Sequence, residues 1–158
     1  MNNSPEKNLV TAFKSAIYAC NDIDLKPIQE FNFNCRSKKY ADIEFISTSD
    51  SHWIIEAKSH KSKDAHNSVH KIFGELLKET GRARNHGLYK FGVLIPIDGR
   101  NFYSRLFSVI PKEKFIAFGN IIPVSAIFCL GEGEFVAYDW SSFYDYHENN
   151  QVEHRLLF

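Results

Sequence analysis

The stretch ADIEFISTSDSHWIIEAKSH, residues 41–60, contains two short apolar runs separated by a polar segment. This pattern predicts a β-hairpin whose turn lies near residues 47–51. Paired positions of an antiparallel hairpin have a constant index sum, here about 98, so Glu44 is expected opposite Ile54 and Asp42 opposite Glu56. The hairpin therefore brings two carboxylates face to face.

The same register sorts the side chains of the hairpin by polarity, because successive side chains of a strand point to opposite faces. A slip of one residue would mix the two sets. One face is expected to cover a core and the other to be charged. The apolar face would carry Ile43, Phe45, Trp53, Ile55 and Ala57, and the charged face Asp42, Glu44, Glu56 and Lys58.

Directly opposed side chains lie only ~5 Å apart. Two carboxylates at that separation repel each other, and one takes up a proton unless a cation lies between them. Asp42 and Glu56 are therefore candidate ligands of Mg²⁺, with the carbonyl of Ala57 as a further oxygen. Lys58 could position an attacking water and stabilise charge on a phosphate. The alternative is a solvated face with a cross-strand ion pair, and Glu44 is either a ligand of a second ion or a carboxylate at the rim.

The rest of the chain predicts one α/β domain over residues 1–158 with a mixed central sheet flanked by helices. Apolar periodicity predicts helices over 4–20 and 66–84, and a third helical stretch over 101–118 that is broken at Pro111. The inward residues would be Leu9, Ala12, Phe13, Ala16, Ile17 and Cys20 in the first helix, and Val69, Ile72, Phe73, Leu76 and Leu77 in the second. Strands are expected at 28–35, 90–97, 121–130 and 134–140, besides the two of the hairpin.

Asp42, thirteen intervening residues and then Glu56-Ala57-Lys58 at the end of an apolar strand resemble the motif of the PD-(D/E)XK nuclease superfamily. The predicted order α-β-β-β-α-β over residues 5–97 is similar to the restriction-endonuclease-like core of that superfamily, with residues 98–158 as a variable extension of α and β elements. Ala41 stands where the motif's name has proline. The resemblance implies a Mg²⁺-dependent DNA endonuclease, with Mn²⁺ as a possible substitute.

Carried over by position, the resemblance makes Asp42 and Glu56 the metal-binding acids and Lys58 the catalytic lysine. It also implies an acid in the first helix, for which Glu6 is the candidate, and a basic or amide residue in the helix after the lysine strand, for which Lys71 or Lys78 is the candidate. Other basic residues flank the motif and could neutralise a nucleic-acid backbone, although solvated turns explain them equally well. They are Arg36, Lys38, Lys39, Lys61 and Lys63.

Other features leave alternatives open. His66 and His70 have a spacing able to hold Zn²⁺, but surface or nucleic-acid-facing histidines are the better interpretation. The aromatic stretch over 138–146 could pack in the core, form the interface of a homodimer or stack on bases. An RNA-directed nuclease is a further possibility. A catalytically silent nuclease-fold module that binds nucleic acid or a partner is the main alternative to an enzyme.

Composition bears on the partners and the cellular compartment of the protein. The 19 basic and 19 acidic residues balance, so that net charge names no partner, although the region 58–90 is basic and 131–158 is acidic. The three cysteines have no CxxC spacing, which favours reduced thiols in a cytoplasmic protein. No signal peptide or membrane-spanning run is expected.

Overall fold

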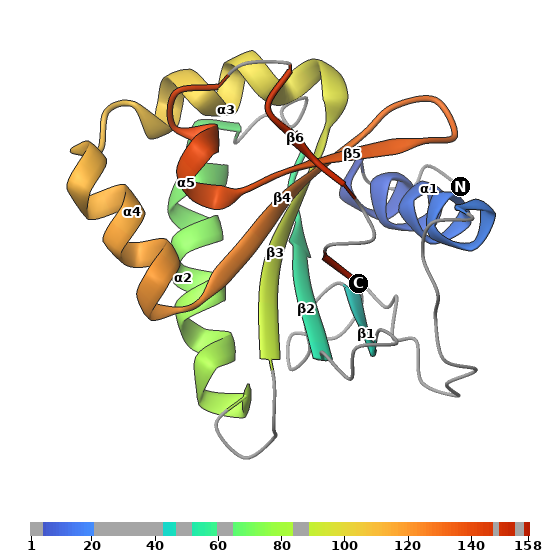
Figure 1. Cartoon of the computed structure of the whole chain (residues 1–158), viewed down its shortest axis with the longest axis horizontal. Coiled ribbons are helices and arrows are strands. Elements are labelled where there is room, and N and C mark those ends of the chain that lie inside the picture. The colour runs from blue at the N-terminus through green and yellow to red at the C-terminus, as the bar shows by residue number, and fades with distance from the viewer. Residues whose placement is uncertain are drawn as a thin grey trace.

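A six-stranded mixed sheet with helices on both faces forms the centre of the protein in the computed structural model (Figure 1). The structure describes residues 5–20, 43–46, 52–59, 65–83, 89–146, 149–153 and 157–158. The helices are α1 (Pro5–Ala19), α2 (Ala65–Ala83), α3 (Arg100–Phe107), α4 (Lys112–Ile121) and α5 (Trp140–Phe143), with a short 3₁₀ turn, η1 (Ile97–Gly99). The strands are β1 (Ile43–Ile46), β2 (His52–Ala57), β3 (Tyr89–Pro96), β4 (Val124–Leu130), β5 (Phe135–Tyr138) and β6 (Gln151–Val152).

The strands follow the order β1-β2-β3-β4-β5-β6 across the sheet. β2, β3 and β4 are parallel to one another, whereas β1, β5 and β6 run antiparallel to their neighbours. The carboxyl ends of the three parallel strands therefore meet at one edge of the sheet, the usual place for ligand sites in open α/β sheets. The expected strand at 28–35 lies outside the described residues.

The predicted hairpin register is confirmed. β1 and β2 pair Ile43 with Ile55, Glu44 with Ile54 and Phe45 with Trp53, so the index sum is the expected one. Asp42 and the turn at 47–51 lie outside the described residues, and the expected Asp42–Glu56 pair stays a prediction.

Two hydrophobic clusters cover the two faces of the sheet. The first contains Phe45 and Ile55 and packs against α1, and Phe158 belongs to it. The second contains Ile54 and packs against α2, α3, α4 and α5. Figure 1 shows the same division, with α1 on one side of the strands and α2 and α4 on the other. The apolar face predicted for the hairpin is therefore confirmed, and the opposite face looks toward α2.

The helical periodicity is confirmed in most positions and wrong in two. In α1, Ala12 is exposed and Val10 is buried in its place. In α2, Leu77 is 59% exposed, whereas Glu79 is 4% exposed. Positions 69, 72, 76 and 79 follow each other at three- and four-residue steps, so the buried face of α2 ends in a carboxylate. Hydrophobicity favours Leu77 for the inward face, but the helical steps place Glu79 there instead.

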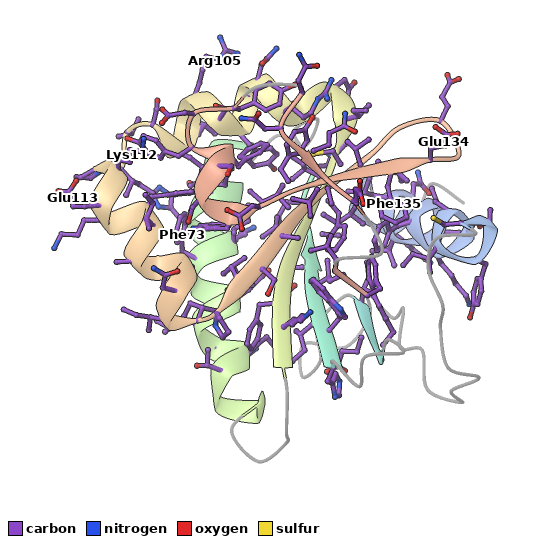
Figure 2. All side chains as sticks on the ribbon, viewed as in Figure 1. Phe73, Arg105, Lys112, Glu113, Glu134 and Phe135 are labelled. Carbon is purple, nitrogen blue, oxygen red and sulfur yellow. The ribbon has the colours of Figure 1, made fainter. Side chains whose placement is uncertain are left out.

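The expected break at Pro111 separates α3 from α4, where Pro111 is the N-cap residue of α4. An aromatic layer fills the space between these helices and the sheet. Trp140 stacks on Phe115 with ring centroids 4.3 Å apart, and Phe73 of α2 meets Phe118 of α4 at 4.6 Å. Figure 2 shows Phe73 between these two helices, while Arg105 and Glu134 point away from the body of the protein.

The aromatic stretch over 138–146 is part of this layer. Tyr138, Trp140 and Phe143 are each no more than 1% exposed, so core packing accounts for these three residues. Trp140 Nε1 donates a hydrogen bond to the carbonyl of Phe115 at 2.8 Å. Cys129 is buried and carries a free thiol, and Cys35 lies outside the described residues.

Candidate functional site

Glu56 and Lys58 lie at the carboxyl end of β2, at the edge of the sheet where the three parallel strands end. Both are nearly buried, with residue exposures of 5% for Glu56 and 8% for Lys58. The amide of Lys58 donates to the carbonyl of Leu94 at 2.9 Å. This bond extends the pairing of β2 with β3 by one residue, so the backbone that carries both side chains is held by the sheet.

The side chain of Lys58 reaches α2. Its Nζ donates a hydrogen bond to Oε1 of Glu75 at 3.1 Å and lies 3.0 Å from Oε2. The Lys58 side chain is 10% exposed and that of Glu75 is 37% exposed, so water reaches the pair from the α2 side. A largely buried ammonium needs such a partner, because a buried charge without one is costly.

Glu56 shares this face of β2 because it alternates with Ile54, which belongs to the cluster under α2. This face of β2 therefore carries charged residues at positions 56 and 58, where apolar side chains would otherwise pack against α2. The sheet and the helix together bury a carboxylate and an ammonium at the end of a central strand. Burial of this kind is typical of functional sites, where charges are held in position and out of bulk water.

The segment after Lys58 is fixed from a third element. The hydroxyl of Tyr103 in α3 donates to the carbonyl of Ser59 at 3.0 Å, and both residues are fully or nearly fully buried. α3 thereby ties down the chain as it leaves β2. Nearby at the same edge, Arg100 donates to the carbonyl of Ile97 at 3.0 Å and to the hydroxyl of Tyr138 at 2.9 Å.

Sequence reasoning missed Glu75 and Glu79. They are the two acids of α2 and stand four residues apart. Glu79 is 4% exposed, whereas the side chain of Glu75 is 37% exposed. For Glu79 the sequence holds a signal, because position 79 continues the three- and four-residue steps of the apolar residues of α2. Within the part of the chain that the structure describes, no group of three or more His, Cys, Asp or Glu side chains is close enough to hold a metal.

Glu44 lies on the α2-facing side of β1 and is paired locally. His52 Nε2 lies 3.7 Å from its Oε1, a separation at which the imidazole attracts the carboxylate when protonated. The contact joins neighbouring strands, and it leaves the rim-carboxylate interpretation a prediction. A role as ligand of a second ion stays a prediction.

The structure does not describe the side chains of several predicted site residues. Asp42 and the basic residues Arg36, Lys38, Lys39, Lys61 and Lys63 lie outside the described residues. The backbone of Glu6 forms the first turn of α1, whose buried residues pack on the face opposite α2, and its side chain is outside the described part. The side chain of His66 is also outside it.

Lys71, Lys78 and His70 are exposed on α2. Lys71 and Lys78 lie four residues before and three residues after Glu75, which places them beside it on the surface of the helix.

Comparison of the chain with protein-family models, with curated proteins and with solved structures finds no match. Within the described residues, no helix is both long and apolar enough to cross a membrane.

Proposed function

We propose that this protein is a Mg²⁺-dependent DNA endonuclease with a restriction-endonuclease-like core, in which Asp42, Glu56 and Lys58 form the catalytic set. One observation carries the proposal. Glu56 and Lys58 are buried on one face at the carboxyl end of a central strand, in the hairpin register that was predicted for them. A carboxylate and an ammonium buried at the end of a central strand are typical of a functional site, and phosphodiester hydrolysis is a reaction that uses both residue types.

The hairpin register supports the proposed place of Asp42, the second carboxylate of the site. Four successive pairs from Ile43↔Ile55 to Ile46↔His52 have a constant index sum. The proposal assumes that this register continues by one residue, to Asp42 and Glu56. Carboxylate oxygens are the ligands that Mg²⁺ prefers, and Glu56 presents them at the strand end. The residues present therefore fit such an ion, with Asp42 and Glu56 as its protein ligands and the carbonyl of Ala57 as a third oxygen.

In the proposed reaction a water attacks the phosphorus in line with the 3′ oxygen, and the bond between phosphorus and that oxygen breaks. The bound metal would lower the pKa of the water and neutralise the developing charge. Lys58 would position the water or stabilise the phosphorane oxygens. The products are a 5′ phosphate and a 3′ hydroxyl, the latter formed when the leaving oxygen takes up a proton.

Glu75 has a supporting role in this proposal. A free lysine side chain has many rotamers, and catalysis requires one position. The two oxygens of Glu75 restrict the ammonium of Lys58 to the region between β2 and α2. Glu75 is thus a positioning residue, because it acts through Lys58. Glu6 stays a candidate further acid of the site.

The basic residues around the motif are proposed to neutralise the DNA backbone: Arg36, Lys38, Lys39, Lys61, Lys63, Lys71 and Lys78. A site of this kind cuts one strand, so cleavage of a duplex favours a two-fold homodimer. An RNA substrate is possible on the same chemistry, since phosphate and metal do not distinguish the sugar.

One observation favours the alternative, a catalytically silent module. The ammonium of Lys58 is already engaged by a carboxylate, as it would be in a structural ion pair. In that case the pair stabilises the contact between β2 and α2 and the protein binds nucleic acid or a partner without cleavage.

The two candidates differ in a nicking assay. Supercoiled plasmid is incubated with Mg²⁺ and with wild type, Glu56→Gln, Lys58→Ala or the control Lys14→Ala on α1. A nuclease gives nicking by wild type and the control and none by the two site variants. Equal nicking by all four proteins means contamination, and binding without cleavage in both Mg²⁺ and Mn²⁺ means the silent module.

A further inference from the structure

A pair of hydrogen-bond donors lies on the α1 side of the sheet, away from the candidate catalytic edge. Trp53 of β2 and Lys90 of β3 are register neighbours, and Trp53 belongs to the cluster that packs against α1. The ammonium of Lys90 lies 5.5 Å from the centroid of the Trp53 ring. Both residues stand near the amino ends of their strands, whereas Glu56 stands near the carboxyl end of β2 and on the opposite face. The pair is therefore separate from the proposed catalytic set.

The two donors lack an anion among the described residues. Trp53 is fully buried, and its Nε1–H meets no acceptor within the described part of the chain. Lys90 Nζ donates to a neutral acceptor, the carbonyl of Leu157, at 3.0 Å. Burial lowers the pKa of the Lys90 ammonium from its ordinary value of 10.5, and no carboxylate of the described residues offsets this effect. Because an unpaired buried donor and a desolvated charge are both costly, the place favours an acceptor that carries negative charge.

The segment Leu157–Phe158 covers this place. Its two residues are 8% and 6% exposed, and Figure 1 shows the C-terminal end of the chain beside β1 and β2. The ring of Phe158 lies among three aromatic rings of the sheet, with centroids 5.3 to 5.9 Å away: Trp53, Phe45 and Phe128. The cover thus consists of a carbonyl oxygen on the ammonium and a phenyl ring on the indole.

The cover shows which chemistry the place accepts. A ligand that replaces it in kind has an oxygen acceptor and an aromatic ring. A carboxylate satisfies the ammonium of Lys90 better than a neutral carbonyl does, because charge-assisted hydrogen bonds are shorter and stronger. Its second oxygen can accept from Nε1 of Trp53. A small inorganic anion would satisfy the donors and leave the aromatic walls without a partner.

We infer that Lys90 and Trp53 form a second ligand site, which binds an aromatic carboxylate in exchange for the Leu157–Phe158 segment. The carboxylate pairs with the ammonium and accepts from the indole, and the ring of the ligand takes the place of the Phe158 ring. Ligand and segment compete, so the apparent dissociation constant exceeds the intrinsic one by the fraction of molecules in which the segment has moved aside. The inference goes beyond the proposed nuclease function and uses none of its residues.

Binding is measured by two-dimensional ¹H–¹⁵N NMR of the whole protein, with 3-phenylpropionate as the probe. The chain has two tryptophans, so two indole Nε1–H cross-peaks are expected, and Trp53→Phe assigns them. The Trp53 cross-peak reports on the site. The Trp140 cross-peak is the internal control for folding, because that indole already donates to the carbonyl of Phe115. The alcohol 3-phenylpropanol supplies the same ring without charge, and inorganic phosphate supplies charge without a ring.

We expect 3-phenylpropionate to move the Trp53 cross-peak downfield and saturably, because hydrogen bonding deshields the indole proton. Lys90→Met should weaken binding roughly tenfold or more, since it removes a charge-assisted hydrogen bond. The matched control Lys14→Met, at an exposed position of α1, should leave binding unchanged. Phe158→Ala should tighten binding several-fold, because the competing ring is gone.

The inference is overturned by the absence of a saturable Trp53 shift in both wild type and Phe158→Ala. Equal affinity for the acid and the alcohol, or equal affinity of Lys90→Met and wild type, also overturns it. A Trp53 shift with phosphate alone would show a general anion site instead of one for an aromatic acid. If the Trp140 cross-peak shows that Phe158→Ala is unfolded, Phe158→Leu takes its place, since leucine keeps an apolar cover and removes the ring.

Discussion

Lys58 and Glu75 join the carboxyl end of β2 to the middle of α2, with the ammonium 3.0 and 3.1 Å from the two carboxylate oxygens. Seventeen positions separate the two residues in the chain. The contact places an acid of α2 directly behind the lysine that the sequence motif singles out. It is the structural feature on which the proposed positioning of Lys58 depends.

Removal of the Glu75 carboxylate should disturb catalysis more than substrate binding. In Glu75→Ala the lysine loses its partner and samples other rotamers, and we expect kcat to fall roughly 10–100-fold with little change in KM. Glu75→Gln keeps an oxygen that accepts a hydrogen bond, so its kcat should lie between those of Glu75→Ala and wild type. Single-turnover cleavage of a labelled duplex measures both, with the exposed Glu113→Ala on α4 as control.

A purely structural Lys58–Glu75 pair predicts a different outcome. Glu75→Ala would then lower the melting temperature and leave the rate per folded molecule unchanged. Partial rescue of the rate by glutamine at equal folded fraction would argue for positioning.

Two helix glycines should respond to alanine with opposite signs. At Gly119 a Cβ would lie 2.1 Å from Cδ1 of the buried Trp140, so Gly119→Ala should destabilise the fold by about 1–3 kcal/mol or more. At Gly74 nothing among the described residues obstructs a Cβ, so Gly74→Ala should stabilise it by about 0.5–1 kcal/mol. Urea unfolding of the two variants beside wild type measures both signs, and two destabilised variants would contradict the packing described for α2.

The two buried tryptophans should differ in their tolerance of phenylalanine. Trp140 donates its indole hydrogen to the carbonyl of Phe115, so Trp140→Phe leaves a buried acceptor without its donor and should cost about 1–3 kcal/mol beyond the lost ring volume. Trp53 Nε1 has no hydrogen-bond partner among the described residues. Trp53→Phe removes no such bond and should be the milder change in the same unfolding assay; an equal or larger loss of stability than in Trp140→Phe would contradict this.

Cys129 gives the fold a predictable dependence on alkaline pH. Burial raises the pKa of its thiol to about 12 from an ordinary value of 9.0. Between these values the unfolded chain loses the proton and the folded chain keeps it, so stability falls as pH rises above 9, by up to about 1.4 kcal/mol per pH unit. Unfolding midpoints of wild type and Cys129→Ala measured from pH 8 to 10.5 should show the steeper decline in wild type, and parallel curves would contradict it.

The sequence predicted much of the fold because its strongest patterns are local. Alternation in the hairpin determined the register, and the apolar runs of β3 and β4 predicted strands buried on both faces. Pro111 predicted the break between α3 and α4. In each case one periodicity or one proline decides the local geometry.

The candidate site could be predicted only in part. Glu56 and Lys58 stood out because charges interrupt an apolar strand, whereas Glu75 and Glu79 look like ordinary surface acids of an amphipathic helix. Which side of α2 faces β2 depends on the packing of α2 against the sheet, and hydrophobicity alone does not place a carboxylate such as Glu79 on the inward face. The contact of Tyr103 with Ser59 depends on tertiary geometry in the same way, as its partners are 44 positions apart.

Plasmid cleavage is the decisive measurement for the proposal that Glu56 and Lys58 belong to a Mg²⁺-dependent phosphodiesterase site. Wild-type protein is expected to convert supercoiled DNA to the nicked or linear form only when Mg²⁺ or Mn²⁺ is present, and Glu56→Gln and Lys58→Ala, both folded, are expected to lose at least about 99% of the rate. Cleavage that persists in both folded variants, or its absence in wild type with either metal, would contradict it.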